Sequence, residues 1–350
     1  MAYTTINKSS LFMNTKLYTG NGNANNAITG VGFQPDWVWI KKRSGADAHY
    51  IFDAIRGVDK QIQSNSTAAE YNYSGDTHRT LTAFGSDGFT LQTSDGVNHN
   101  NQTFASWNWK AGTSVSGNTT GSGTAKAYSG SVNTGAGFSI IKYVGNGSAG
   151  HTIPHHLGVT PEIIITKRLS DAGEWYVYSP VMGNTKHMRL NQTGAEDTAN
   201  TIWNNTSPTS SVFTVGTNGD VNGNNNPIIA YSFNSVQGYS KFGSYVGNGN
   251  ADGSYVHLGF KPAFIMIKVT STTSNWGMFD NKRLGFNPKN EFVRANETTS
   301  ESSDYDGIDF LSNGFKLRTT STLVNAAQTY LYMAFGQSLV GTNNVPATAR

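Results

Sequence analysis

The side chains with the clearest potential for chemistry are three closely spaced histidines. His151, His155 and His156 carry imidazoles that could in principle hold a metal ion. The chain contains no cysteine, and no carboxylate stands at ligand spacing beside these histidines. The corresponding segments elsewhere in the chain carry no histidine cluster. We therefore interpret the three as polar loop or interface histidines, and we expect no metal site and no cofactor.

A pair of carboxylates that could hydrolyse a glycosidic bond is the second candidate. Asp53 and Asp280 occupy equivalent positions in an internal repeat, but Ser179 stands at the third such position. A duplicated structural position explains this pattern better than catalysis does. The chain also has no cysteine nucleophile and no Gly-x-Ser-x-Gly elbow. We expect no catalytic residue, although glycosidase carboxylates need not be close in sequence, so a polysaccharide-degrading enzyme stays as an alternative.

Two glycine-rich strings imitate ligand-binding loops. Residues 145–150 satisfy the dinucleotide pattern Gly-x-Gly-x-x-Gly, but residues 151–154 do not open the helix that a phosphate cradle needs. We predict a hairpin turn there. Residues 218–223 resemble the head of a calcium loop, yet Ile229 stands where a bidentate glutamate is required. We predict an Asx-rich hairpin at this second string.

Tryptophans could stack on sugar faces, and the chain has seven of them. Comparison within the repeat indicates that most belong to the core, because other apolar residues replace them at equivalent positions: Trp37, Trp39, Trp107 and Trp109. We expect Trp39 and Trp109 to be buried. Trp203 differs, since it lies in a polar stretch, residues 200–206, that varies between the repeats. It is the candidate for an exposed binding residue.

A threefold internal repeat is the strongest feature of the sequence. The string Tyr18 to Gly22 recurs at residues 143–147 and 245–249, each time with Gly-Asn-Gly at its end. A proline follows each copy, with a lysine six residues after it and an aromatic residue seventeen after it. These landmarks are Pro35, Pro161 and Pro262, Lys41, Lys167 and Lys268, and Phe52, Tyr178 and Phe279. The shared spacing indicates three homologous units.

The composition and patterning predict β-structure throughout. Charged residues make up only 13% of the chain and glycine contributes 39 residues, which favours many turns. Residues 36–41, 162–167 and 263–268 are apolar on both alternating faces, as in a strand buried between two layers. Residues 103–109 alternate their large side chains. We predict an all-β chain of three tandem homologous β-sandwich domains, of jelly-roll or lectin-like type.

The predicted organisation follows the repeat boundaries. It comprises an arm at residues 1–11, sandwiches at 12–112, 138–238 and 239–337, a Gly/Ser/Thr-rich linker at 113–137, and a C-terminal tail at 338–350. The linker predicts that the first unit is loosely joined, whereas the second and third pack directly. The arm has few apolar side chains, so we expect it to lie against another domain or another chain and to add a strand to a sheet edge.

The charge pattern argues against two classes of partner. The net charge is +3, and only residues 41–43 form a basic run, so the focused basic face of a nucleic-acid reader is missing. No amphipathic membrane-surface segment is evident, and no apolar run reaches the length of a spanning helix. The first residues do not read as a secretory signal. We expect neither nucleic-acid binding nor membrane insertion, and synthesis in a cytoplasm.

The most distinctive strings of the first unit are residues 19–22, 28–41 and 104–112, with Trp-x-Trp in the last. These strings resemble a repeated domain of marine cyanophage and pelagiphage proteins of the tail-fibre-like type. The second and third units keep the Gly-Asn-Gly, proline and lysine landmarks but depart at Trp-x-Trp. The resemblance implies a location on the virion surface, with assembly in the host cytoplasm, and it supplies no catalytic residue.

The function that this resemblance implies is non-enzymatic. We expect a capsid decoration protein, or a tail-fibre or receptor-binding appendage, that serves particle structure and attachment to the host surface. Other virion proteins of the capsid or tail are the expected partners. A host cell-surface glycan and further copies of the chain stay open as partners. The alternative is a glycan-binding lectin or a polysaccharide-degrading enzyme of the tailspike type.

Overall fold

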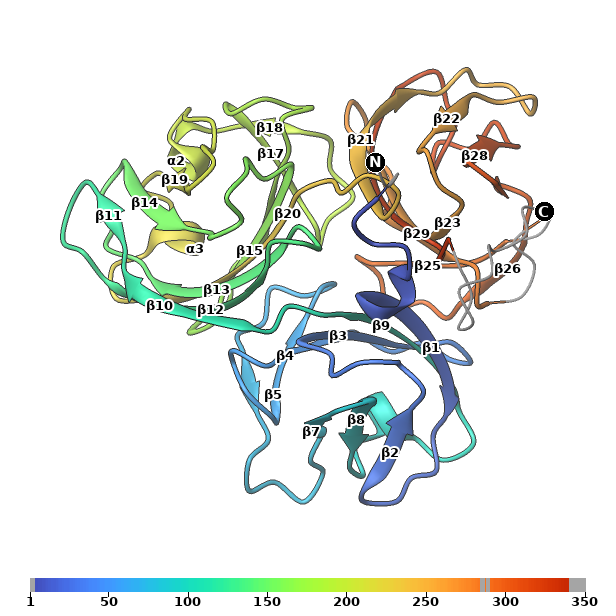
Figure 1. Cartoon of the computed structure of the whole chain (residues 1–350), viewed down its shortest axis with the longest axis horizontal. Helices are drawn as coiled ribbons and strands as arrows, with labels where there is room; N and C mark the ends of the chain where they lie inside the picture. Colours follow the sequence, from blue (N-terminus) through green and yellow to red (C-terminus); the bar gives the residue numbers. More distant parts are fainter. Residues whose placement is uncertain (1–3, 284–286, 288–289, 340–350) are drawn as a thin grey trace.

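The computed structural model describes residues 4–283, 287 and 290–339. Antiparallel strands dominate it and form three pairs of sheets, each pair consisting of one large and one small sheet (Figure 1). The predicted all-β class is confirmed. Within the described residues, no helix is long and apolar enough to cross a membrane.

The first unit packs a six-stranded sheet, in the order β1-β9-β3-β4-β5-β6, against a three-stranded sheet, β2-β8-β7. Pro35 precedes β3, where its missing N–H removes no ladder bond. The elements are β1 Met13–Thr19, β2 Asn26–Thr29, β3 Trp37–Lys42, β4 His49–Asp53, β5 Lys60–Gln63, β6 Tyr71–Asn72, β7 Leu81–Gly85, β8 Gly88–Leu91, α1 Asp95–Asn98 and β9 Thr103–Trp109.

The third unit repeats this strand order. Its large sheet runs β21-β29-β23-β24-β25-β26, and its small sheet runs β22-β28-β27. The elements are β21 Ser240–Val246, β22 Tyr255–His257, β23 Pro262–Val269, β24 Gly277–Asp280, β25 Asn290–Arg294, β26 Ser302–Tyr305, β27 Ile308–Leu311, β28 Gly314–Leu317 and β29 Thr329–Gly336.

The second unit has a similar large sheet, with two more strands, β10 and β12, added at one edge. Its large sheet, β10-β12-β13-β20-β15-β16-β17-β18, has eight strands, and its small sheet is β11-β14-β19. The elements are β10 Thr113–Asn118, β11 Thr120–Gly121, β12 Ala127–Asn133, β13 Phe138–Val144, β14 His151–Pro154, β15 Ile163–Arg168, β16 Trp175–Tyr178, β17 Lys186–Arg189, β18 Asp197–Thr198, α2 Asn200–Trp203, β19 Val212–Val215, α3 Gly219–Asn222 and β20 Pro227–Phe233.

The prediction of a flexible linker at residues 113–137 is wrong. This segment forms β10, β11 and β12, and β12 pairs with β13 from Tyr128 opposite Tyr143 to Asn133 opposite Phe138. Its small residues serve close packing rather than flexibility. A Cβ added to Gly130 would lie 2.4 Å from the Ile140 carbonyl oxygen, so this glycine lets the added strand approach the sheet.

The three large sheets face one another at the centre of the molecule, and the small sheets lie outside (Figure 1). On β3, Val38 and Ile40 point into the core of the first sandwich, whereas Trp37 and Trp39 point into a core shared by all three units. This explains why the strand is apolar on both faces. The shared core, which we call the central core, includes Trp37, Trp39, Trp107, Trp109, Phe138, Ile140, Tyr231, Phe233, Phe264, Met266, Met333 and Phe335.

The burial predicted for Trp39 and Trp109 is confirmed, since each side chain is 1% exposed. Their surroundings come from more than one unit. The Trp109 ring lies 4.5 Å from that of Trp37 and 5.7 Å from that of Phe335 in the third unit. Trp37 stacks in turn on Tyr231 of the second unit, with ring centres 4.6 Å apart. The indoles therefore join the units to one another.

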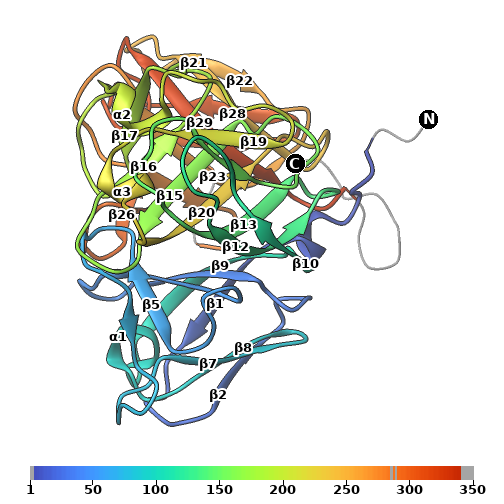
Figure 2. The same ribbon diagram turned by 90° about the vertical axis from the view of Figure 1, so that its left-hand side faces the viewer.

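The N-terminal arm lies against the third unit, as expected for contact with another domain. Ile6 is 4% exposed and belongs to the central core, and the Leu339 N–H donates to the Asn7 carbonyl at 2.9 Å. In Figure 2 the arm runs past one end of the molecule. The expected strand is not formed within residues 4–11, where the only regular element is a short 3-10 turn, Ser9–Leu11. Most of the predicted tail, residues 340–350, lies outside the described residues.

Candidate functional site

The two repeated carboxylates are held in buried ion pairs. Asp53 ends β4 and contacts Arg56 with 2.5 Å between Oδ2 and Nε, and Asp280 ends β24 and contacts Arg283 at 2.7 Å. All four side chains are fully buried. Burial acts to lower the pKa of Arg56, but Asp53, Tyr231 and Glu70 together outweigh it and raise that pKa. The pairs occupy the duplicated structural position that the repeat predicts.

A neighbouring unit completes each of these ion pairs. The Tyr231 hydroxyl of the second unit donates to Asp53 Oδ2 at 2.7 Å, and Trp107 Nε1 of the first unit donates to Asp280 Oδ2 at 3.0 Å. The third set differs: Met333 stands where the other units have the donor, and Ser179 stands where they have the carboxylate. These carboxylates hold units together, and they are enclosed by protein.

The repeated lysines join the units in a closed ring. Lys41, Lys167 and Lys268 are fully buried, and burial lowers the pKa of each to about 8. Each ammonium donates to a backbone carbonyl of the adjacent unit: Lys41 to Thr298 at 3.2 Å, Lys167 to Thr67 at 3.0 Å, and Lys268 to Thr193 at 3.1 Å. The expectation that the first unit is loosely joined is therefore wrong.

The residues that receive these lysines were not predicted from the sequence. The acceptor threonine stands three residues before a glutamate in every unit, at Thr67 and Glu70, Thr193 and Glu196, and Thr298 and Glu301. The glutamate N–H donates back to the neighbour, from Glu70 to Leu169, Glu196 to Thr270 and Glu301 to Arg43. The recurring Thr-x-x-Glu spacing was a signal that could have revealed these contacts.

A buried asparagine explains the Gly-Asn-Gly motif, and it too was missed. Asn325 is fully buried, accepts from the Asn248 N–H at 3.1 Å, and donates to the Asn250 and Thr319 carbonyls at 2.7 Å. Asn98 and Asn222 do the same in the other units. The first glycine of the motif leaves room for this contact, since a Cβ at Gly247 would lie 2.1 Å from the Ala326 carbonyl oxygen.

Both predicted hairpins have a different structure. The loop at residues 145–150 joins β13 to β14, which belong to different sheets, so it is a corner between layers. A strand follows it, which agrees with the rejection of a dinucleotide site. Residues 219–222 form the short helix α3, because the Asn218 side chain accepts from the Asp220 N–H at 2.8 Å and caps it.

The three histidines make contacts within the protein and do not form an exposed cluster. His151 lies in β14 and contacts the Asn146 side chain at 2.8 Å, and His156 contacts the Tyr128 hydroxyl at 2.8 Å. Burial lowers the pKa of His155 to about 4. No group of three or more potential metal-binding side chains is found among the described residues.

Trp203 is also buried, contrary to the expectation of an exposed ring. Its side chain is 1% exposed and lies edge-on to Tyr178, with ring centres 5.8 Å apart, and to Phe213 at 6.5 Å. The polar residues Asn200 and Thr201 before it belong to the short helix α2, which turns the indole inward. Trp203 is therefore a core residue of the second unit.

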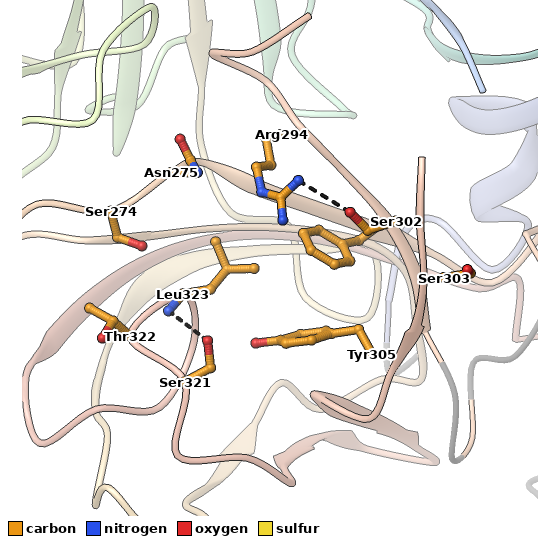
Figure 3. Close-up of a pocket in the computed structure, with 10 residues that line it drawn as sticks. Ser274, Asn275, Arg294, Ser302, Ser303, Tyr305, Ser321, Thr322 and Leu323 are labelled. Atoms are coloured by element: carbon orange, nitrogen blue, oxygen red, sulfur yellow. Dashed lines mark hydrogen bonds between the residues drawn. The ribbon is translucent and has the colours of Figure 1, made fainter. Parts of the chain in front are cut away.

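An open pocket on the third unit offers a free surface. It has a volume of about 400 Å³, within the range of small-molecule sites, and lies at the end of the sandwich between β25, β26 and the loops before β24 and β29 (Figure 3). Phe292, Tyr305 and Leu323 form its apolar part. Its polar wall consists of Ser274, Asn275, Ser302, Ser303, Ser321 and Thr322.

Arg294 supplies the one cationic side chain among the described residues of this pocket wall. Its guanidinium lies over the Phe292 ring at 4.8 Å, donates to the Ser302 hydroxyl at 3.2 Å, and is 3.7 Å from the Glu297 carboxylate. Glu297 is thus its ion-pair partner beside the pocket. The Tyr305 hydroxyl points toward Ser321, and burial raises its pKa to about 12, so it stays protonated at neutral pH (Figure 3).

The pocket retains free hydrogen-bonding groups. Within the part of the chain that the structure describes, the hydroxyls of Ser274, Ser303 and Thr322 make no hydrogen bond. Asn275 accepts from Asn296 through Oδ1 at 2.6 Å, which leaves its Nδ2 as a donor. The pocket wall therefore presents hydroxyl and amide groups to its opening, while Phe292 is only 2% exposed beneath them.

Comparison with known proteins gives a family but no activity. The chain shows no significant similarity to a curated protein or to a solved structure. One family model, described as a domain of unknown function (DUF7483), matches residues 8–338. The match runs through all three units without a break, in keeping with a core that the units share. The chain belongs to the DUF7483 family.

Proposed function

We propose that this chain is a non-catalytic structural and attachment protein of a virion surface. The closed ring of contacts between the three units supports the proposal most strongly. The repeated lysines and carboxylates, which are the groups that could otherwise do chemistry, are used to join units. The result is a rigid body that turns three small sheets outward (Figure 1). Such a body suits repeated contact with a particle and with a cell surface.

Locating the chain on particles tests this proposal. Antibody raised against the purified chain should label the surface of intact virions in immunogold electron microscopy, and the chain should co-purify with particles in a density gradient. A matched serum raised against an internal virion protein is the control. A chain that stays wholly in the soluble fraction of the lysate would disprove the virion location.

The non-catalytic part of the proposal has its own test. Purified chain incubated with host-surface polysaccharide should release no new reducing ends, whereas a commercial glycosidase in a parallel tube should do so. Release that depends on the intact chain would contradict the proposal and favour the enzyme alternative. The variant Asp53→Asn would then show whether a buried carboxylate takes part.

A further inference from the structure

Strand β10 leaves one edge of the second unit's large sheet open (Figure 1). It pairs with β12 on one side, and no strand of the described residues pairs with its other side. Five of its six residues are exposed, and Val115, the exception, is half-buried. The strand therefore presents an unpaired row of backbone groups to solvent, with both of its faces accessible.

This edge lacks the features that usually prevent strands of different chains from pairing. The sequence carries no charged residue and no proline between Lys110 and Lys126. The other edges of the large sheets have such features: β1 and β21 carry Lys16 and Lys241, β6 and β18 are two residues long, and β26 follows an irregularity in register. Among the large sheets, β10 is therefore the edge best suited to pair with another strand.

The direction of the free backbone groups follows from the hairpin that β10 forms with β12. At the end of this hairpin the Thr119 N–H donates to the Lys126 carbonyl at 2.8 Å. Because backbone groups alternate in direction along a strand, Ser114, Ser116 and Asn118 direct theirs away from β12. Within the described residues, no hydrogen bond reaches these outward groups. Each of the three residues thus offers one donor and one acceptor to a partner strand.

We propose that this edge pairs with the same edge of a second copy of the chain, across a two-fold axis at Ser116. An antiparallel pair centred there places Ser116 opposite its counterpart and Ser114 opposite Asn118, so every outward N–H and C=O has a partner. An axis at Val115 would instead leave Asn118 opposite Gly112, which lies outside the strand.

The side chains of β10 suit pairing with an identical strand. On one face, serine lies opposite serine or asparagine, so small uncharged groups meet one another. On the other face, Val115 would lie opposite Gly117, which has no side chain to clash with it. A two-fold contact occupies both edges, so it ends at a dimer and builds no fibre. One strand pair buries less surface than a standard stable interface, so the dimer should be weak and reversible.

Sedimentation velocity of the purified chain over a wide concentration range tests the proposal, and we expect a reversible equilibrium between monomer and dimer. Ser116→Pro removes an outward N–H but no bond to β12. This variant should therefore stay monomeric while its urea unfolding is unchanged. A wild-type chain that stays monomeric up to its solubility limit would overturn the proposal, and so would a dimer that survives Ser116→Pro.

Ser244→Pro is the matched control, because it makes the same change at an exposed position of the open edge strand β21. The N–H of Ser244 also points away from its sheet, since the Gly247 N–H, three residues further on, donates toward β29 at the Gln328 carbonyl. This variant should keep the dimer. Loss of the dimer in Ser244→Pro but not in Ser116→Pro would place the contact on the third unit.

A pair of charged variants tests the position of the axis. Ser116→Lys places two ammonium groups opposite each other and should weaken the dimer about fivefold, and Ser116→Glu should do the same with two carboxylates. A mixture of the two variants should dimerise at least as well as the unchanged chain, because opposite charges then face each other across the axis. A mixture no better than either variant alone would refute pairing at Ser116. These measurements use no particles, so their outcome is independent of the proposed virion location.

Discussion

Replacing Trp109 by alanine should weaken all three units together. The indole is 1% exposed and packs on Trp37 in its own unit and on Phe264 and Phe335 in the third. Large-to-small changes of a buried tryptophan cost about 3–5 kcal/mol, and a site walled by several large rings cannot collapse easily. Since the hole opens in the central core, the destabilisation should spread beyond the first unit.

Urea unfolding together with hydrogen exchange read by mass spectrometry measures both effects. Phe89→Ala is the matched control, because Phe89 is 2% exposed and belongs to the first sandwich's own core, and its loss falls in the same range of cost. Trp109→Ala should raise exchange in β23 and β29 as well as in β9, whereas Phe89→Ala should raise it first in the first unit. Unchanged protection of β23 and β29 in Trp109→Ala would refute the shared core.

Three other changes have defined outcomes. Tyr231→Phe leaves Asp53 without its donor from the second unit and should cost about 1–3 kcal/mol in urea unfolding; a neutral result would contradict the joining role of this hydrogen bond. Asn325→Ala leaves the Asn248 N–H unpaired and should cost about 1–3 kcal/mol, with exchange rising first in that loop, and uniform change across the unit would count against a local clamp. Burial lowers the pKa of His155 and His187 to about 4, so as pH falls from about 6.5 the unfolded chain takes up protons that the folded chain refuses. Unfolding free energy should therefore decrease by about 1.4 kcal/mol per pH unit per histidine over this window, and a smaller slope is expected for His187→Gln; equal slopes would contradict the assignment.

The sequence predicted the strands well where one local pattern decides them. Residues 36–41 are apolar on both faces, and the prediction of a strand between two layers is confirmed by β3. The identity of the second layer lay beyond local pattern, because Trp37 meets Tyr231 far along the chain. The same holds for Lys41, whose carbonyl partner Thr298 is supplied by another unit. The spacing of the repeat shows which positions recur, but it does not show which residue of another unit each of them contacts.

The errors at the linker and at Trp203 have a common cause. Both predictions treated polar composition as a sign of exposure or flexibility. Residues 113–137 instead form strands because serine, threonine and glycine permit close approach at a sheet edge. Trp203 stands among polar neighbours, yet helix α2 buries only the side chains of Ile202 and Trp203 and leaves its other residues outside the core. The composition of a segment describes all its side chains together, whereas in the folded chain some of them point into the core and others point to solvent.

The pocket could not be found from a sequence motif for a different reason. A motif lies in one segment, whereas the wall of this pocket comes from β25, β26 and the loops before β24 and β29. Sequence pattern alone does not show that these four segments meet at one end of the sandwich.

The three interfaces of the ring differ in a coordinated way. A buried carboxylate is costly unless it is paired and hydrogen-bonded. Asp53 and Asp280 occur where the facing unit supplies Tyr231 or Trp107, and Met333 occurs where the facing position is Ser179. Because donor and acceptor are kept or lost together, each interface is matched to its own partner. A unit placed in the wrong position would keep its buried carboxylate paired with its own arginine. It would, however, lose the hydrogen bond from the neighbouring unit or bury a donor without an acceptor, so these contacts favour one arrangement of the units around the ring.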